Sequence, residues 1–235
     1  MKASTKNVIK SIAVLSVIAL VCVAILSLAN VFLKKEVTLD KATVKFLNEK
    51  FATTAPTTTG TDSDTAYNED YFVMLTDGEL SNASGYTYKS FKSNSSNYVS
   101  AIYYAQKGAN EGVYYIESVS VGYQNPISVV VSFVIDNGDF SIQNIAVKEQ
   151  REDFGDRKTQ VLNPETFFYY VSLVKSDEDM NITDADIIAA TGATTKKSVA
   201  GLNRAVTRAI DTMNKIYTKS DEIKAEINKR GGQNG

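Results

Sequence analysis

The sequence predicts an α+β protein in which one N-terminal transmembrane helix carries a domain with a mainly antiparallel sheet and flanking helices. Three observations lead to this prediction. Residues 11–33 form an uncharged apolar run, residues 113–149 contain β-rich runs around a turn signal, and residues 196–217 repeat apolar side chains at helical spacing. The length of 235 residues suits one membrane anchor and one domain of ordinary size.

The apolar run from Ser11 to Leu33 contains no charged residue. At about 1.5 Å per residue, a helix of this length spans about 35 Å, which exceeds the ~30 Å hydrocarbon core of a membrane. The run is also longer than the ~7–15 apolar residues of a cleaved signal peptide. We therefore predict a single-pass anchor, preceded by a cytoplasmic N-terminus at residues 1–10. Lysines flank both ends of the run, so charge alone does not fix its orientation.

Residues 34–65 are predicted to connect the anchor to the domain. Their first part, 37–51, predicts an amphipathic helix because charged residues are interspersed among apolar ones at helical spacing. The segment TTAPTTTGTDSDT, at 53–65, is rich in Thr and poor in apolar residues, which is typical of a linker. The domain is therefore expected to begin at residue 66.

The next part of the chain favours short strands joined by turns. Residues 71–75 predict a first strand, and the Ser-, Asn-, Tyr- and Gly-rich segment 81–100 predicts short strands and turns. Residues 113–123 are rich in β-branched and aromatic side chains, and Asn125-Pro126 ends that run. A hairpin is predicted next, because two β-rich runs flank Asn137-Gly138, a pair that type I′ turns prefer.

Helices follow the predicted hairpin. Residues 165–175 predict an amphipathic helix, with the Asn163-Pro164 pair supplying its cap and its first position. We interpret Ile187-Ile188 as a short strand-like stretch. Residues 196–217 place apolar side chains three or four positions apart, which predicts a helix with one buried face. The charged segment 218–235 that follows predicts a mobile tail.

The predicted domain, residues 66–217, contains neither histidine nor cysteine. The single Cys22 lies in the apolar run, where a lipobox is a weak alternative because Val21 occupies a position that favours small residues. This composition excludes His-based acid–base catalysis, a Cys nucleophile and His or thiolate metal sites in the domain. Flavin is the leading redox cofactor, since its ring carries the chemistry and needs neither residue. Scattered basic residues and a net charge of −2 give no nucleic-acid footprint.

The segment TGATT stands immediately before the last predicted helix. It comprises the candidate cofactor-binding residues Thr191, Gly192, Ala193, Thr194 and Thr195. Its small residues let a ligand approach the backbone, and the N-terminus of the next helix favours a phosphate. Lys196 and Lys197 oppose the helix dipole there, and a bound phosphate would reverse that cost. The alternative interpretation is an ordinary helix N-cap, where small hydroxylated residues are common.

Four segments carry a family resemblance that covers nearly the whole chain. LSLANVFLKK, at 26–35, resembles the end of that family's anchor, and residues 122–127 with the turn at Asn137-Gly138 resemble its GYGGPI–strand–DG hairpin. EQREDFGDR, at 149–157, falls where the family has a loop like EHKETPGLG. TGAT, at 191–194, falls where it has the motif Asp-x-x-Ser/Thr-Gly-Ala-Thr. The chain thus resembles the G-type FMN-binding subunit of Rnf electron-transport complexes, and is similar to the C-type subunit of the sodium-translocating NADH:quinone reductase.

The resemblance implies FMN attached covalently, through its phosphate, to the last Thr of the motif, which is Thr194 here. The motif residues around it are Thr191, Gly192 and Ala193, followed by Thr195. The resemblance also implies a separate flavin transferase that uses FAD and a metal ion. Such help suits a Thr hydroxyl, which is a poor nucleophile and here has no base beside it in sequence. Glu152 and Gly155 match the family's loop and are further candidates for the cofactor site.

The chain departs from the family's pattern at four positions. The family's motif Asp, hairpin Gly, loop His and loop Pro are replaced by Ile188, Gln124, Gln150 and Phe154. The acids nearest to the motif position are Asp184 and Asp186. If the transferase reads the motif's Asp, its replacement disfavours covalent loading. If the loop covers the flavin ring, its changed residues predict a different flavin potential.

We therefore expect an electron-transfer flavoprotein subunit in the cell membrane, with its globular domain outside the cytoplasm. Its implied partners are the other membrane subunits of an Rnf-type ion-translocating complex, within which it would carry electrons and not act as an independent catalyst. Two alternatives stay open. One is a membrane-tethered non-redox binding or assembly module with a degenerate flavin site, and the other is a stand-alone extracytoplasmic flavoprotein.

Overall fold

The structure is a computed structural model that describes residues 14–23, 39–51, 71–108, 110–151, 160–176 and 181–231. The chain divides into two units, Met1–Val37 and Thr38–Gly235. In the first unit residues 14–23 are helical, and the rest of the predicted anchor lies outside the described residues. Among the described residues, no helix combines the length and the apolar character that crossing a membrane requires. The anchor therefore stays a prediction.

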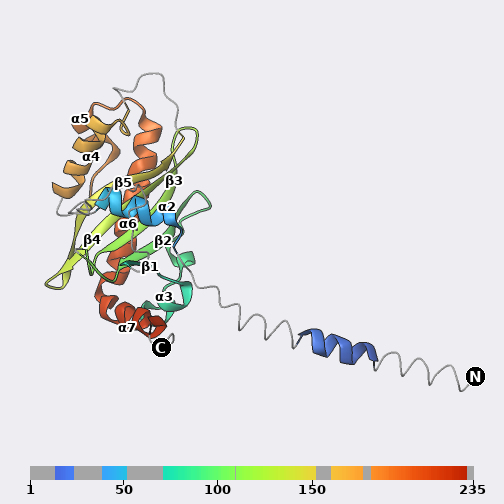
Figure 1. Ribbon diagram of the computed structural model, residues 1–235. Coiled ribbons are helices and arrows are strands. Elements are labelled where there is room, and N and C mark those ends of the chain that lie inside the picture. The colour runs from blue at the N-terminus through green and yellow to red at the C-terminus, as the bar shows by residue number, and fades with distance from the viewer. Residues whose placement is uncertain are drawn as a thin grey trace, which may run out of the picture. The chain divides into compact units, whose positions relative to one another are not determined.

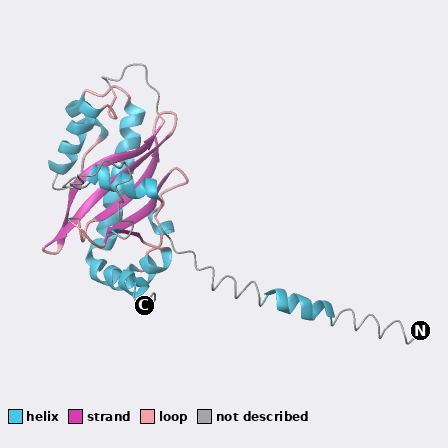
Figure 2. Ribbon diagram, viewed as in Figure 1, coloured by secondary structure: helices cyan, strands magenta, loops and turns pink. Residues whose placement is uncertain are grey.

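The second unit is built on one antiparallel sheet of five strands, in which each strand pairs with its neighbour in sequence (Figure 1). The strands are β1 (Phe72–Met74), β2 (Asn97–Ala105), β3 (Tyr114–Val121), β4 (Pro126–Asp136) and β5 (Asp139–Gln150). Helices flank this sheet (Figure 2). The predicted α+β class, with an antiparallel sheet and flanking helices, is confirmed.

The β4–β5 turn has the predicted conformation. Asp136 pairs with Asp139, and Asn137 and Gly138 between them have φ values of 51° and 85°. Positive φ at both central residues is the requirement of a type I′ turn. The turn fixes the register, so that alternate residues of β4 face one side of the sheet. The fully buried members of this set are Ile127, Val129, Val131 and Phe133.

Two helices pack against opposite faces of the sheet. On one face α6 (Lys196–Ile216) packs on β2, β3 and β4, and the predicted apolar stripe is its buried side. The hydroxyl of Ser118 on β3 donates to the carbonyl of Ala205 on α6 at 2.6 Å. On the other face α2 (Lys41–Phe51) buries Val44 and Leu47 in a second, smaller core cluster. The sheet therefore has an apolar layer on each side.

The amphipathic helix predicted at 37–51 is confirmed over Lys41–Phe51, but it is part of the domain. It begins after Asp40, whose carboxylate accepts hydrogen bonds from the Thr43 amide at 2.8 Å and the Thr43 hydroxyl at 2.7 Å. Its last residue, Phe51, packs edge-on against the ring of Tyr115 on β3. The predicted division at residue 66 is thus corrected, because α2 covers the sheet. The Thr-rich segment 53–65 lies outside the described residues.

The segment between β1 and β2 differs from the prediction of strands and turns at 81–100. It contains α3 (Asp77–Ser84) and a short 3-10 helix, η2 (Tyr88–Phe91), before β2 begins. The reason is local capping. The Thr76 hydroxyl accepts from the Glu79 amide, Glu79 accepts from the Thr76 amide, and Gly85 closes the helix at φ 76°.

A second difference concerns Ile187-Ile188, which is helical and not strand-like. These residues belong to α5 (Asp184–Thr191), which begins with a capping box between Thr183 and Asp186 and ends at Gly192. The pattern was too short to separate a helix from a strand, and the caps decide it. The preceding helix, α4 (Pro164–Ser176), has the predicted start, because Asn163 Oδ1 accepts from the Glu165 amide at 3.1 Å.

The predicted mobile tail at 218–235 is also corrected. After a short 3-10 turn, η4 (Tyr217–Lys219), the chain forms α7 (Ser220–Gly231). The reason is burial: Ile223 and Ile227 belong to the main core cluster and are fully buried. Residues 232–235 lie outside the described residues.

Candidate functional site

The TGATT segment is the connection between α5 and α6. Thr191 is the last residue of α5, and Gly192 adopts φ 66° and donates its amide to the carbonyl of Ile188 at 2.9 Å. Thr195 then stands at the N-cap position of α6. The left-handed conformation at Gly192 reverses the chain with no side-chain strain, which lets two helices follow each other within four residues.

The hydroxyl-bearing residues of this connection have different surroundings. The Thr191 hydroxyl is buried, donates to the Ile187 carbonyl at 2.6 Å and accepts from the Ala193 amide at 3.2 Å. Thr194 is exposed. The Thr195 hydroxyl is buried without a hydrogen-bond partner among the described residues. Only Thr194 of this segment therefore combines a hydroxyl nucleophile with access from solvent.

Ala193 and Gly192 set the position of Thr194. Ala193 is fully buried in the main core cluster, whereas Gly192 and Thr194 on either side are exposed. Because this alanine packs in the core between two exposed residues, it fixes the position of the connection. The Thr194 backbone is thus held in place although its side chain faces solvent. This arrangement holds the exposed Thr194 hydroxyl at a defined position on the surface of the domain.

The N-terminus of α6 has positive electrostatic character. Thr195 makes no side-chain cap, and the amides of Lys196 and Ser198 donate instead to the backbone carbonyls of Thr194 and Thr195, each at 3.0 Å. Lys196 and Lys197 follow in the first turn and are exposed. The aligned peptide dipoles add a partial positive charge at this end. Together these features favour an anionic group beside Thr194.

The turn that follows β3 lies against the first turns of α6. A Cβ atom built on Gly201 would lie 2.7 Å from both the Gly122 Cα and the Val121 carbonyl oxygen, so only glycine permits this approach. Arg204 Nη2 donates to the same Val121 carbonyl at 2.8 Å. One turn earlier, Lys197 Nζ lies 5.3 Å from the centre of the Tyr123 ring.

The start of the predicted loop meets the same turn. Asn125 Nδ2 donates to the carbonyl of Arg151 at 2.9 Å, directly after β5 ends. Two of the segments that carried the family resemblance therefore meet: the turn at 122–127 and the start of the loop at 149–157. The turn also lies against α6, the helix that follows TGATT. Glu152 and Gly155, the further candidates in that loop, lie outside the described residues.

The acids nearest to the motif position already have structural partners. The Asp184 carboxylate accepts from Asn203 Nδ2 at 2.8 Å. The Asp186 carboxylate accepts from the Thr183 hydroxyl and the Thr183 amide, and these hydrogen bonds lower the pKa of Asp186 below its ordinary value. Both acids therefore act in capping and packing of α5. Ile188, at the motif position itself, packs against the main core.

Sequence reasoning missed Gly201 and Arg204, which hold the β3 turn against α6. The available signal was Gly201 itself. A glycine within the apolar stripe of a helix indicates that another segment packs closely against the helix at that point. It also missed a partly buried charge pair on the α2 face of the sheet. Glu117 accepts from Lys148 Nζ at 2.7 Å, from the Tyr103 hydroxyl at 2.7 Å and from Ser128 at 3.1 Å.

Comparisons of the chain with protein-family models, with curated protein sequences and with solved structures found no match. A functional assignment therefore depends on the residues and the geometry described above.

Proposed function

We propose that this protein is a membrane-anchored electron-transfer flavoprotein subunit of an Rnf-type ion-translocating complex, carrying FMN as a phosphoester on Thr194. One observation carries the proposal. The exposed Thr194 hydroxyl stands on a pinned connection at the N-terminus of a 21-residue helix. A phosphoester of that oxygen would place its negative charge at the positive end of the helix, next to Lys196 and Lys197.

The residues of the connection fit the phosphate of FMN. Gly192 has no atom within 4 Å of the position of a Cβ, so the surface beside Thr194 is open. The first-turn amides of Lys196 and Ser198 already donate to the carbonyls of Thr194 and Thr195, so the attraction for the phosphate comes from the helix dipole and from the exposed ammonium groups of Lys196 and Lys197. Ammonium donors favour a dianion, since charge-assisted hydrogen bonds are stronger than neutral ones. Tyr123, held near Lys197, supplies an exposed aromatic surface close by.

FMN, when bound, would supply the redox chemistry, which the His-free and Cys-free domain does not provide from its own side chains. The protein would fix the cofactor in place and pass electrons between neighbouring redox subunits of the membrane complex. The proposed anchor at residues 11–33 would keep the domain at the outer face of the cell membrane. A covalently fixed cofactor does not diffuse to its partners, so a tether of this kind suits it.

Attachment would need a separate flavin transferase. The Thr194 oxygen would bond to the phosphorus of the FMN half of FAD, AMP would leave, and the hydroxyl proton would pass to a base of the transferase. The described carboxylates nearest in sequence, Asp184 and Asp186, are occupied in capping and packing of α5. An external base and metal ion are therefore part of the proposal.

A second candidate function is a membrane-tethered non-redox binding module with a degenerate flavin site. The specific observation in its favour is Ile188, which packs against the core at the position where the family's motif has an acid, with Asp184 and Asp186 committed elsewhere. A stand-alone extracytoplasmic flavoprotein would keep the same Thr194 chemistry. Co-purification with other membrane subunits separates that alternative from the complex.

The test is co-expression of the full chain with a flavin transferase, followed by a denaturing gel and intact-mass measurement. We expect flavin fluorescence in the denatured band and an FMN-sized mass increase on the Thr191–Lys196 peptide. Thr194→Ala should abolish both signals, and Thr194→Ser should keep them. Thr195→Ala is the matched control and should also keep the adduct. No adduct on the wild type, or an adduct that survives Thr194→Ala, refutes the assignment.

A further inference from the structure

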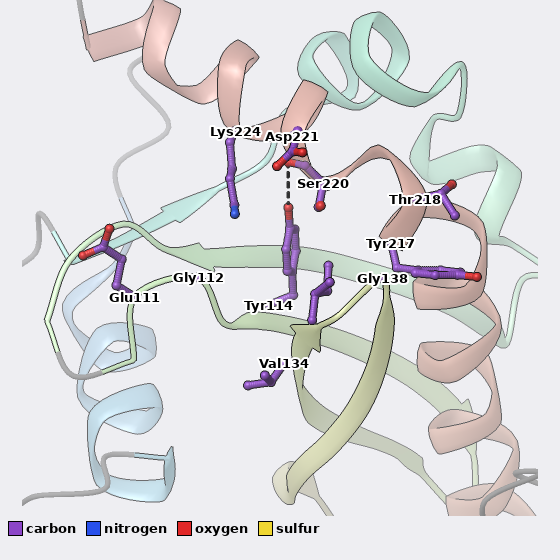
Figure 3. A pocket seen from close by; sticks show the side chains of 11 residues that line it. Glu111, Gly112, Tyr114, Val134, Gly138, Tyr217, Thr218, Ser220, Asp221 and Lys224 are labelled. Carbon is purple, nitrogen blue, oxygen red and sulfur yellow. Dashed lines mark hydrogen bonds between the residues drawn. The ribbon is translucent and has the colours of Figure 1, made fainter.

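A cavity of about 500 Å³ opens beside the C-terminal end of α6, at the junction with α7 (Figure 3). Its walls come from the β2–β3 connection, the β4–β5 hairpin, η4 and the first turn of α7. The side chains that matter for its chemistry are Glu111, Tyr114, Val134, Tyr217, Asp221 and Lys224. We call it the α7 cavity. Its volume suits a small ligand.

Two carboxylates and one ammonium line the α7 cavity. Glu111 comes from the β2–β3 connection, whereas Asp221 and Lys224 come from α7. None of the three forms an ion pair with another residue in the part of the chain that the structure describes. In Figure 3 the Lys224 side chain points down into the space beside Tyr114, and Asp221 lies above the Tyr114 hydroxyl. Opposite charges thus share one cavity without contacting each other.

The rest of the lining is aromatic and apolar. The Tyr114 hydroxyl reaches the cavity and lies 3.4 Å from the Ser220 carbonyl, to which it donates. Burial raises the pKa of this phenol above its ordinary value, so it stays a protonated donor. The Tyr217 ring is supported by Phe140, with ring centres 5.2 Å apart. Val134 and Ile135 contribute aliphatic surface.

The mixture of charges selects the class of ligand. A simple cation would meet the Lys224 ammonium, and a simple anion would meet Glu111 and Asp221. A molecule with both charges would satisfy each of them, and tyrosine rings add affinity for an ammonium. We propose that the α7 cavity binds a small zwitterion with an ammonium at one end, a carboxylate at the other and a short aliphatic body.

In this arrangement the ligand's carboxylate contacts Lys224, which in Figure 3 lies between Glu111 and Asp221, and its ammonium contacts Asp221. The aliphatic body lies against Ile135 and the Tyr217 ring, which pack on the same face of the sheet. The site is independent of the proposed function, because the 21 residues of α6 separate it from Thr194 by about 30 Å at ~1.5 Å per residue.

The first experiment compares three probes of equal chain length on the full protein in lipid nanodiscs. The probes are 4-aminobutanoate, butylamine and butanoate, titrated by ligand-observed NMR. Because one exposed ion pair contributes up to about 1 kcal/mol, we expect the zwitterion to bind about fivefold more tightly than either singly charged probe. Absence of binding by 4-aminobutanoate, or equal affinity for butylamine, overturns the proposal.

The second experiment assigns each charge. Lys224→Met should weaken 4-aminobutanoate binding about threefold to fivefold and remove its advantage over butylamine. Asp221→Asn should weaken it similarly and remove the advantage over butanoate. Lys219→Met is the matched control, since Lys219 pairs with Glu222 at 3.1 Å and does not line the cavity. Unchanged thermal unfolding excludes a folding defect.

Two outcomes of these variants count against the site. One is an unaltered affinity in Lys224→Met, and the other is an equal loss in Lys219→Met. Thr194→Ala should bind the probes like the wild type. A failure of flavin attachment with intact zwitterion binding would therefore refute the proposed function alone, and the converse result would refute the α7 cavity alone.

Discussion

The two ends of α6 are built in opposite ways. At the N-terminal end the helix meets backbone directly: Gly201 lies against Gly122, and Arg204 bonds to the carbonyl of Val121. At the C-terminal end the chain turns through η4 into α7, beside the α7 cavity, whose charged side chains form no ion pairs within the described part of the chain. We call the first the closed end, because Gly201 of α6 packs directly on the backbone of the β3 turn, and the second the open end, because it borders the α7 cavity.

This difference suits two kinds of ligand. A covalently attached group needs no pocket, because its bond supplies the affinity and only its position has to be fixed. A freely exchanging small molecule needs a cavity with charges that the protein itself does not neutralise. The N-terminal end provides one exposed hydroxyl, Thr194, on a pinned connection. The C-terminal end provides volume and charges of both signs.

The largest expected loss of stability follows from a substitution at the closed end of α6. Gly201→Ala would place a Cβ 2.7 Å from backbone atoms of the β3 turn, so α6 or the turn must move. We expect a loss of about 1–3 kcal/mol in the free energy of unfolding, because overpacking exceeds the gain in helix propensity of less than ~1 kcal/mol. Urea denaturation of the full chain measures it.

The matched control is Gly78→Ala. Gly78 also lies in a helix, α3, but the nearest atom to its Cβ position is 3.8 Å away. This substitution should leave stability unchanged or raise it by up to about 1 kcal/mol. If Gly201→Ala and Gly78→Ala change the free energy of unfolding equally, α6 does not pack closely on the β3 turn at Gly201.

Some parts of the fold could be predicted because their signal is local. The Asn137-Gly138 turn, the Asn163-Pro164 helix start and the apolar stripe of α6 each depend on residues within a few positions. The burial of α7 was not predicted, because most of its residues are charged or polar. Ile223 and Ile227 are too few to mark a buried helix, and only the core that they enter gives them meaning.

The candidate site was predictable to a similar extent. The pattern of TGATT indicated a loop before a helix, and only the family resemblance implied Thr194 within it. The different burial of Thr191 and Thr194 could not be predicted from either. That difference arises because α5 continues to Thr191, whereas the sequence favoured a strand. The α7 cavity was not predictable, since its charges come from segments more than 100 residues apart, which only the tertiary fold brings together.

A smaller effect is expected from Arg230, whose contacts hold α7 beside the α7 cavity. Arg230 near the end of α7 donates from Nε to Glu79 Oε1 at 2.8 Å and from Nη2 to the Met74 carbonyl at 3.1 Å. Arg230→Ala should lower stability by about 1–2 kcal/mol, because Glu79 is buried and loses a charged donor. Amide exchange in α7 should accelerate before that in α6.

Lys229→Ala provides the comparison for this prediction. Lys229 is next to Arg230 but pairs with Glu226, on the same helix, and its side chain is 67% exposed. The change should cost less than about 0.5 kcal/mol. Equal exchange rates in the two variants would mean that the Arg230 contacts do not hold α7, and that the wall of the cavity is fixed by Ile223 and Ile227 alone.

The smallest expected effect concerns pH at the closed end. Hydrogen bonds from the Thr183 hydroxyl and then the Thr183 amide lower the pKa of Asp186 below its ordinary value of 3.8. A carboxyl with a lowered pKa in the folded state stabilises α5 above the unfolded value, and this contribution disappears as pH falls through the folded value. Asp186→Asn should therefore flatten the acid side of the stability profile between about pH 5 and about pH 2.

Thermal midpoints across that range measure the change, and Thr183→Ala should flatten the profile in the same way because it removes the hydroxyl partner. If both variants keep the wild-type slope, the α5 cap does not cause the loss of stability in acid. The contacts that hold the TGATT connection at low pH would then be the buried Ala193 side chain and the Thr191 hydroxyl.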